Sequence, residues 1–124
     1  MRTVQIYTLQ GLKRVTFAFW TTTGPRMIEA SVTIDYGPAR ELTLESAAEW
    51  PPNDDYTEAV FEEIRRSVAS LTDKRFGGRF TLERIEFHDV HSSKLAFQLA
   101  TREAVRSLFS MSQLIEYRDG LYTK

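Results

Sequence analysis

Hydrophobic and polar residues alternate along much of the first half of the chain. Between Met27 and Tyr36, apolar or aromatic side chains stand at every second position, and polar or charged residues stand between them. This period of two is typical of a β-strand with one buried face. The shorter segments Val15–Thr21 and Glu41–Glu45 repeat the pattern, and Val4–Leu9 is expected to form a further strand or the start of the first one. Glycines and prolines between these segments mark the turns.

The period changes after Pro51-Pro52. Six residues then share one stripe at helical spacing: Tyr56, Val60, Ile64, Ser67, Val68 and Leu71. Side-chain oxygens in Asn53-Asp54-Asp55 can accept hydrogen bonds at the start of this helix. After Gly77-Gly78, the segment Phe80–Phe87 predicts a strand with Leu82 and Phe87 inward and a kink between them.

A second helix is predicted from Lys94 to about Phe109, with Ser93 as its N-cap. Its inward stripe contains three alanines, which allow a close approach to the sheet: Ala96, Phe97, Ala100, Ala104, Leu108 and Met111. Gln113–Tyr117 is expected to form a last short strand. Strands, helix, strand and helix in this order predict an α+β fold, with a sheet and two helices in a single domain spanning residues 1–124.

Composition supports one globular domain, because 124 residues with 42% hydrophobic and 27% charged side chains can bury a core. The absence of cysteine excludes disulfides, a thiol nucleophile and cysteine-based metal sites, and it fits a reducing compartment. The longest apolar runs, such as Phe17–Trp20, are far too short to span a bilayer, and the first residues lack a signal-peptide core. We therefore expect a cytoplasmic protein without a membrane partner.

The net charge of −1 disfavours a dedicated nucleic-acid module, since such modules usually carry a basic excess. Four acidic residues are expected on the outward face of the sheet: Glu29, Asp35, Glu41 and Glu45. Any RNA contact must then use a local basic patch away from that face.

Both histidines lie in one short segment, His88–Lys94, between a predicted strand and a predicted helix. Three interpretations compete there. His88, Asp89 and His91 could ligate a metal, or Ser92 or Ser93 could act with a histidine in a hydrolase. Alternatively, the polar side chains could simply hold the turn while Ser93 caps the helix. No phosphate-binding glycine loop occurs, so neither GTP nor another cofactor is expected.

The same segment resembles the fourth domain of elongation factor G. That family carries Tyr-His-Asp-Val-Asp-Ser-Ser-Glu-Met-Ala-Phe-Lys-Ile-Ala, and this chain matches it closely over Phe87–Ala100. The family's Tyr-x-x-Ala-Val-x-x-Gly-Ile helix is similar to Tyr56–Ile64, and its preceding proline to Pro51 or Pro52. The resemblance is clearest over residues 21–109.

The resemblance implies a four-stranded sheet with two helices packed on one face and a left-handed βαβ crossover. It also implies a non-enzymatic module whose tip loops contact RNA and the small ribosomal subunit. One family loop is a glycine-rich hairpin, of which Thr21–Met27 keeps only Gly24. The family's second Asp is His91 here, and its Glu after the serines is Lys94. The chain contains no GTPase sequence.

A basic stripe favours RNA contact, because Lys94, Gln98 and Arg102, with Arg106 at the margin, recur on one helical face. Trp50 could stack on a base or could pack beneath a loop. The predicted contact residues are Arg26, Trp50, His88, Asp89, His91, Ser92, Lys94 and Arg102. The alternative is a protein-interaction or homo-oligomeric module that has kept the fold and lost the RNA role.

Overall fold

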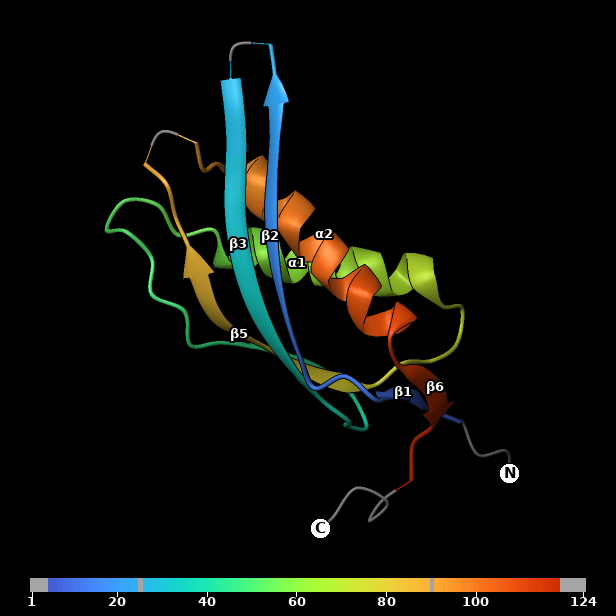
Figure 1. Cartoon of the computed structure of the whole chain (residues 1–124). Helices are drawn as coiled ribbons and strands as arrows, with labels where there is room; N and C mark the ends of the chain where they lie inside the picture. Colours follow the sequence, from blue (N-terminus) through green and yellow to red (C-terminus); the bar gives the residue numbers. More distant parts are fainter. Residues whose placement is uncertain (1–4, 25, 90, 119–124) are drawn as a thin grey trace.

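The computed structural model describes residues 5–24, 26–89 and 91–118. Its main sheet has four strands in the order β2-β3-β5-β4. These strands are β2 (Arg14–Thr23), β3 (Arg26–Gly37), β5 (Gly78–Glu86) and β4 (Leu42–Ser46). Helices α1 (Thr57–Leu71) and α2 (Lys94–Ser110) pack together on one face of the sheet (Figure 1). The predicted α+β fold, with a four-stranded sheet and two helices, is confirmed.

The core lies between the inward rows of the sheet and the two helices. In β3 the predicted inward row is confirmed, since Ala30, Val32 and Ile34 are almost fully buried. Ser31 and Thr33, two of the polar residues between them, are buried as well, because β3 is a central strand with β2 and β5 on either side. The helices add Val60, Ile64, Phe97 and the three alanines of α2, all completely or largely enclosed. β4 runs parallel to β5, whereas β2 and β5 run antiparallel to β3. Helix α1 therefore forms the crossover of a β-α-β unit.

The predicted kink in β5 is also confirmed. Ile34 pairs with Leu82, whereas its neighbour Thr33 pairs with Arg84, so Glu83 is the additional residue of a β-bulge. The bulge lets Leu82 and Ile85 both lie on the inward side, with Ile34 and Val32 as their partners.

Residues near both ends of the described chain form a second, two-stranded sheet. β1 (Tyr7–Gln10) pairs antiparallel with β6 (Gln113–Glu116), so the early segment is a separate strand and not the start of β2. Residue Val4, at which the expected strand began, lies outside the described residues. The hydroxyl of Tyr36 joins the two sheets, because it accepts a hydrogen bond from Leu9 N at 3.0 Å and lies 2.5 Å from Thr8 Oγ1.

The predicted helix stripes are wrong at two positions. Leu71 ends α1 with 38% of its surface exposed, and Met111 follows α2 with 67% exposed, because each lies beyond the last buried position of its helix, Val68 or Leu108. Polar residues take part in the buried faces instead: Glu63 and Thr101 are almost fully enclosed. Glu63 is compensated by hydrogen bonds from Arg66 Nη1 at 2.7 Å and Ser67 Oγ at 3.3 Å.

The outward face of the sheet is less acidic than expected. Asp35 pairs with Arg14 of β2, and hydrogen bonding to this guanidinium lowers the pKa of the Asp35 carboxyl against the effect of desolvation. Arg79 and Arg84 of β5 add further positive charge, since they oppose Gly37 and the outward Thr33. Glu41 precedes β4 and is not a strand residue. Glu29 and Asp35 do lie on this face, but the arginines beside them were missed, because alternation assigns side chains to a face without identifying their neighbours across the sheet.

In the described part of the chain, no helix is both long and apolar enough to cross a bilayer.

Candidate functional site

Three connections gather at one end of the main sheet. The hairpin between β2 and β3 projects furthest, and the segments 47–56 and 87–93 lie at the same end (Figure 1). Glu29 of β3 donates its backbone N–H to His91 O at 3.0 Å. Gly37 pairs with Arg79 at the opposite end. We call the end formed by the hairpin and these two segments the tip.

Ser92 holds the tip loop onto the sheet. Its hydroxyl accepts a hydrogen bond from His88 N at 2.9 Å and donates one to Glu29 O at 2.7 Å. Its backbone N–H donates to His88 O at 2.8 Å, so the loop closes on itself. Because the hydroxyl bridges two backbone groups, Ser92 positions the loop on the sheet.

We expect Ser92→Ala to lower the free energy of unfolding by about 1–3 kcal/mol, because it leaves a partly buried N–H and a carbonyl without their partner. Urea denaturation would measure the loss. The matched control is Ser70→Ala, since Ser70 is exposed and its hydroxyl makes one local bond, to Ser67 O. Equal effects of the two substitutions would contradict the role given to Ser92.

His88 lies beside a carboxylate that the sequence did not place there. Its Nε2 is 3.2 Å from Glu29 Oε2, and both side chains are partly exposed. Glu29 was expected on an acidic face remote from the site. It lies at the tip because β5, which precedes His88, pairs antiparallel with β3 and ends next to the start of β3. When His88 is protonated, Glu29 neutralises its charge within this pair.

The remaining loop residues differ in exposure. Asp89 is exposed and His91 is half-buried, whereas Val90 lies outside the described residues. Arg26 begins β3, opposite Thr23, so its backbone lies at the tip as expected. Its side chain is outside the described part of the structure.

Helix α2 starts at the tip. Ser93 caps it as predicted, because its side chain accepts a hydrogen bond from Ala96 N at 3.2 Å. Lys94, Arg102 and Arg106 are exposed and Gln98 is half-buried, so the predicted stripe does face solvent. We call these four residues the α2 stripe.

The α2 stripe reaches a cleft between the two helices. Arg102 and Arg106 line this cleft of about 260 Å³ together with Arg66 of α1. Glu103 Oε2 lies 3.1 Å from Arg106 Nη1 and 3.9 Å from Arg102 Nε, so a carboxylate partly offsets the two cations. Lys94 is the first residue of α2, so among the cations of the α2 stripe it lies nearest to the tip loop.

Trp50 packs against other aromatic side chains. The ring of Trp50 packs edge-on against Phe97 and Tyr56, with centroids 4.9 and 5.8 Å apart. This arrangement is the alternative in which an aromatic side chain packs beneath a loop. Its buried indole N–H has no hydrogen-bond partner among the described residues.

Trp20 is the exposed tryptophan, with 65% of its surface accessible. It lies on the outward face of β2, directly opposite Glu29, and so beside the residue that pairs with His88. The sequence contained a signal for this position. Val15, Phe17 and Phe19 form the inward row, so Trp20 falls in the outward, polar phase of the alternation.

A metal site and a hydrolase were the other two interpretations of segment His88–Lys94. Among residues 5–24, 26–89 and 91–118, no three His, Cys, Asp or Glu side chains come together as metal ligands. The hydroxyls of Ser92 and Ser93 are engaged with backbone groups, as a loop clamp and a helix cap. The polar-loop interpretation accounts for both serines.

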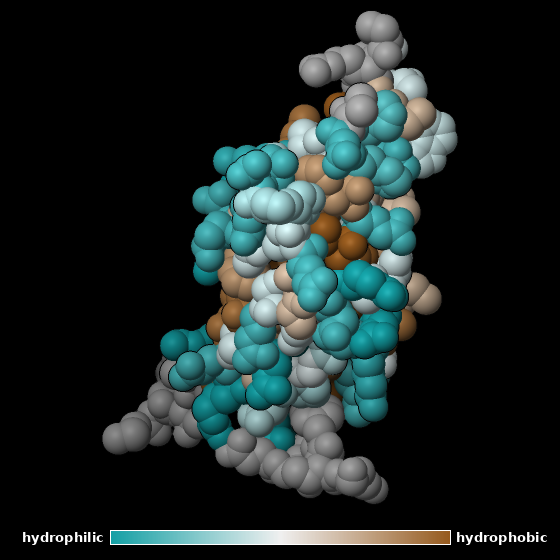
Figure 2. Space-filling view, turned by 90° about the vertical axis from the view of Figure 1, so that its left-hand side faces the viewer, coloured by the Kyte–Doolittle hydropathy of each residue, from teal (hydrophilic) through white to brown (hydrophobic). Residues whose placement is uncertain are grey.

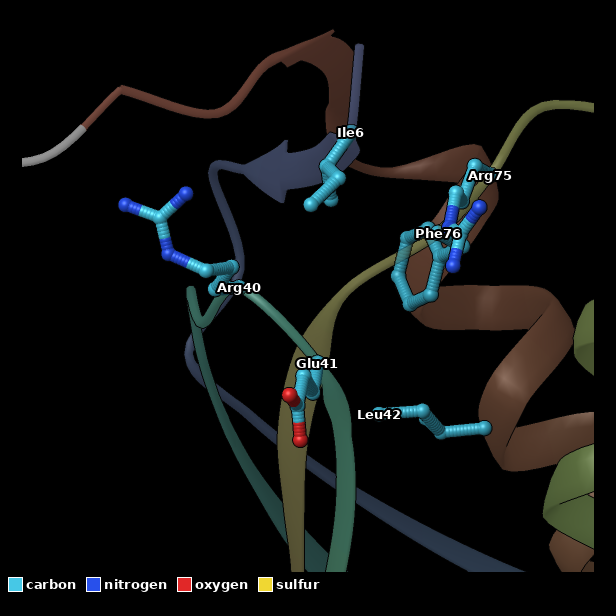
Figure 3. A pocket seen from close by; sticks show the side chains of 6 residues that line it. All are labelled: Ile6, Arg40, Glu41, Leu42, Arg75 and Phe76. Atoms are coloured by element: carbon cyan, nitrogen blue, oxygen red, sulfur yellow. The ribbon is translucent and has the colours of Figure 1, made fainter. Parts of the chain in front are cut away.

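A larger pocket lies at the opposite end of the molecule. It measures about 350 Å³, and Figure 3 shows its lining: Ile6, Arg40, Glu41, Leu42, Arg75 and Phe76. The Arg40 guanidinium points away from Phe76 in this view and lies 5.7 Å from the ring centroid of Tyr117. This pocket belongs to the end where β1 and β6 meet the main sheet, and it contains no residue of the tip.

Comparisons with known proteins agree with this geometry. The sequence profile of a family described as "Elongation factor G, domain IV" matches residues 7–113. A crystal structure of a protein from Thermus thermophilus superposes with a TM-score of 0.76 at 21% sequence identity. The superposition covers 94% of this chain and 18% of the Thermus chain, so the shared unit is a small part of that protein. No curated protein sequence matches.

Proposed function

Since the chain belongs to the elongation factor G domain IV family, we propose that it contacts RNA of the small ribosomal subunit through its tip. Domain IV of elongation factor G is itself a non-catalytic domain, so the proposed role is binding, without GTP and without a chemical step. The observation that carries the proposal is the arrangement at the tip. An exposed aromatic side chain, Trp20, lies in the same row as the Glu29–His88 pair, and α2 with its cationic Lys94 begins just after this loop.

These groups provide the two interactions that RNA requires. Cations such as Lys94 and Arg102 neutralise phosphates, and each such contact adds salt-sensitive affinity. A flat exposed ring such as Trp20 can stack on an unpaired base with little dependence on its sequence. The Ser92 clamp fixes the loop before binding, which lowers the entropic cost of ordering it.

Acidic groups limit how strong this contact can be. Glu29 and Asp89 lie in the same region, and the whole chain is slightly negative. We therefore expect a contact with about three or four phosphates, for which the logarithm of affinity falls with the logarithm of salt concentration with a slope of about −2 to −4.

The test is sedimentation of the protein with purified small ribosomal subunits over a range of salt concentrations. The double variant Lys94→Glu/Arg102→Glu is expected to weaken binding about tenfold or more and to make the salt slope about two units shallower. The matched control is Arg75→Glu/Arg79→Glu, which reverses two exposed arginines at the opposite end of the molecule. The control should bind like the unmodified protein.

A second variant tests the stacking role without changing charge. Trp20→Ala is expected to weaken binding about fivefold or more, as for other aromatic residues that stack on a base. Met111→Ala removes an exposed apolar side chain of similar accessibility beyond the far end of α2 and should have no effect. If the unmodified protein fails to sediment with subunits at low salt, the proposal is wrong, and a protein-interaction role is favoured.

A further inference from the structure

β2 forms an open edge of the main sheet. It has ten residues, and within the described residues its only partner strand is β3, so one side of its backbone lacks a strand (Figure 1). Its register with β3 is unbroken from Arg14↔Asp35 to Thr23↔Arg26, so no bulge twists the edge away. Every second residue of a regular strand directs its N–H and C=O to the unpaired side. This edge can therefore accept another antiparallel strand.

The usual protection of a strand edge is absent here. Soluble proteins guard exposed edges with charges, prolines, bulges or very short strands, since an open edge recruits further strands. Residues 15–23 of β2 contain no charged residue, no proline and no glycine. The other edge strand, β4, has only five residues. For comparison, Figure 2 shows another side of the molecule, the one on which β5 lies. That side is mainly hydrophilic, and its apolar colour is confined to small separate areas.

The core is also incompletely covered at β2. In the neighbouring strand, Val32 and Ile34 are fully enclosed. Their partners in β2 include Phe17, which is only half-buried, and Phe19 at the next inward position is half-buried as well. An additional strand beside β2 would continue the inward row and remove these aromatic side chains from water.

We propose that β2 pairs with β2 of a second copy of this chain, in an antiparallel arrangement centred on Ala18, to form a symmetric dimer. The two four-stranded sheets become one continuous sheet. This register places Phe17 of each copy opposite Phe19 of the other on the inward face, and Ala18 opposite Ala18 on the outward face. Arg14 falls opposite Thr22, so no like charges meet along the shared edge.

The helix layer is compatible with this dimer. Helix α2 packs equally against β2 and β3, which places its axis near the boundary between these strands. With strands about 4.8 Å apart, the two α2 helices of the dimer would lie roughly 10 Å apart, a usual distance between packed helices. The tip side chain Trp20 stands on the outward face, so pairing along the edge leaves it accessible.

Sedimentation velocity of the full chain at about 100 µM tests the oligomeric state. We expect a dimer, and we expect Ala18→Lys to raise its dissociation constant about tenfold or more, because two ammonium groups would face each other at the symmetry axis. Ala18 is exposed in the single chain, so the lysine should leave the fold intact, which circular dichroism would verify. Ala69→Lys, at an exposed position of α1, makes the same change away from the edge and should leave the dimer unchanged.

Cross-linking tests the register independently. The chain has no cysteine, so Ala18→Cys introduces a single thiol. Opposed residues at the centre of an antiparallel pair are close enough for a disulfide. Mild oxidation should therefore convert Ala18→Cys to a covalent dimer and leave Ala69→Cys largely monomeric. A monomeric unmodified protein, a dimer that Ala18→Lys does not weaken, or equal cross-linking of the two cysteine variants would each overturn the proposal.

Discussion

Replacing Phe97 with alanine is expected to lower the free energy of unfolding by about 3–5 kcal/mol. Phe97 is fully buried in α2, and its ring contacts three other aromatic rings: Trp50, Tyr56 and Phe87. These partners belong to different parts of the chain, before α1, at its start and after β5. Truncation leaves a cavity that the surrounding rings can fill only in part. Urea denaturation followed by tryptophan fluorescence would measure the loss.

The matched control is Leu95→Ala, two residues earlier in the same helix. Leu95 is 51% exposed, so its truncation should cost less than about 0.5 kcal/mol. Phe97→Ala should also speed amide exchange at residues 87–89 and 91–93, because Phe87 loses one of its two stacked aromatic partners and keeps only Tyr56. If the two alanine variants were equally stable, the aromatic cluster would not be what holds the tip connections together.

Replacing Gly77 with alanine is expected to destabilise the protein by about 3 kcal/mol. A Cβ at this position would lie 2.2 Å from Ala39 O and 2.7 Å from Arg40 O. Both are backbone atoms, so no side-chain rotation can relieve the overlap. The backbone at Gly77 must therefore move away from residues 39 and 40. This movement weakens the hydrogen bonds from Gly77 N to Tyr7 O and from Gly78 N to Glu41 O. Thermal and urea unfolding would both report the change.

Gly37→Ala is the control for this substitution. A Cβ at Gly37 would meet no atom within 4 Å, and its backbone does not adopt a positive φ angle. We expect a change within about 0.5 kcal/mol, or a slight stabilisation, because alanine restricts the unfolded chain. If Gly77→Ala were as stable as Gly37→Ala, the close approach of residues 39 and 40 to this turn would be disproved.

Local patterns in the sequence determined most of the elements. The alternation in Met27–Tyr36 predicted a strand and identified the face that packs on the helices, because with a period of two all the apolar side chains fall on the same face. Ser93 at the start of a helical pattern specified the cap, and it forms the predicted bond to Ala96 N. The glycines at 77 and 78 marked the point at which β5 begins. Such signals act over a few residues, so the sequence carries them directly.

The family resemblance was strongest in a segment, Phe87–Ala100, whose serines hold the local structure. The Ser92 hydroxyl joins His88 to Glu29 and Ser93 caps α2, so both serines have structural roles. This explains why a motif can be recognised although the charges around it differ from the family's. The motif thus indicated the fold more directly than it indicated the chemistry of the tip.

Contacts between distant segments were decided only by the tertiary structure. Glu29 pairs with His88 because β5 ends beside β3, and Trp20 rather than Trp50 is exposed because segment 47–56 folds Trp50 onto Phe97. Periodicity assigns a residue to a face of its own element, but the partner across that face depends on strand order and on the length of each connection. For this chain, the sequence therefore determined the elements and their buried sides, and the packing of the sheet decided which charges and rings meet at the tip.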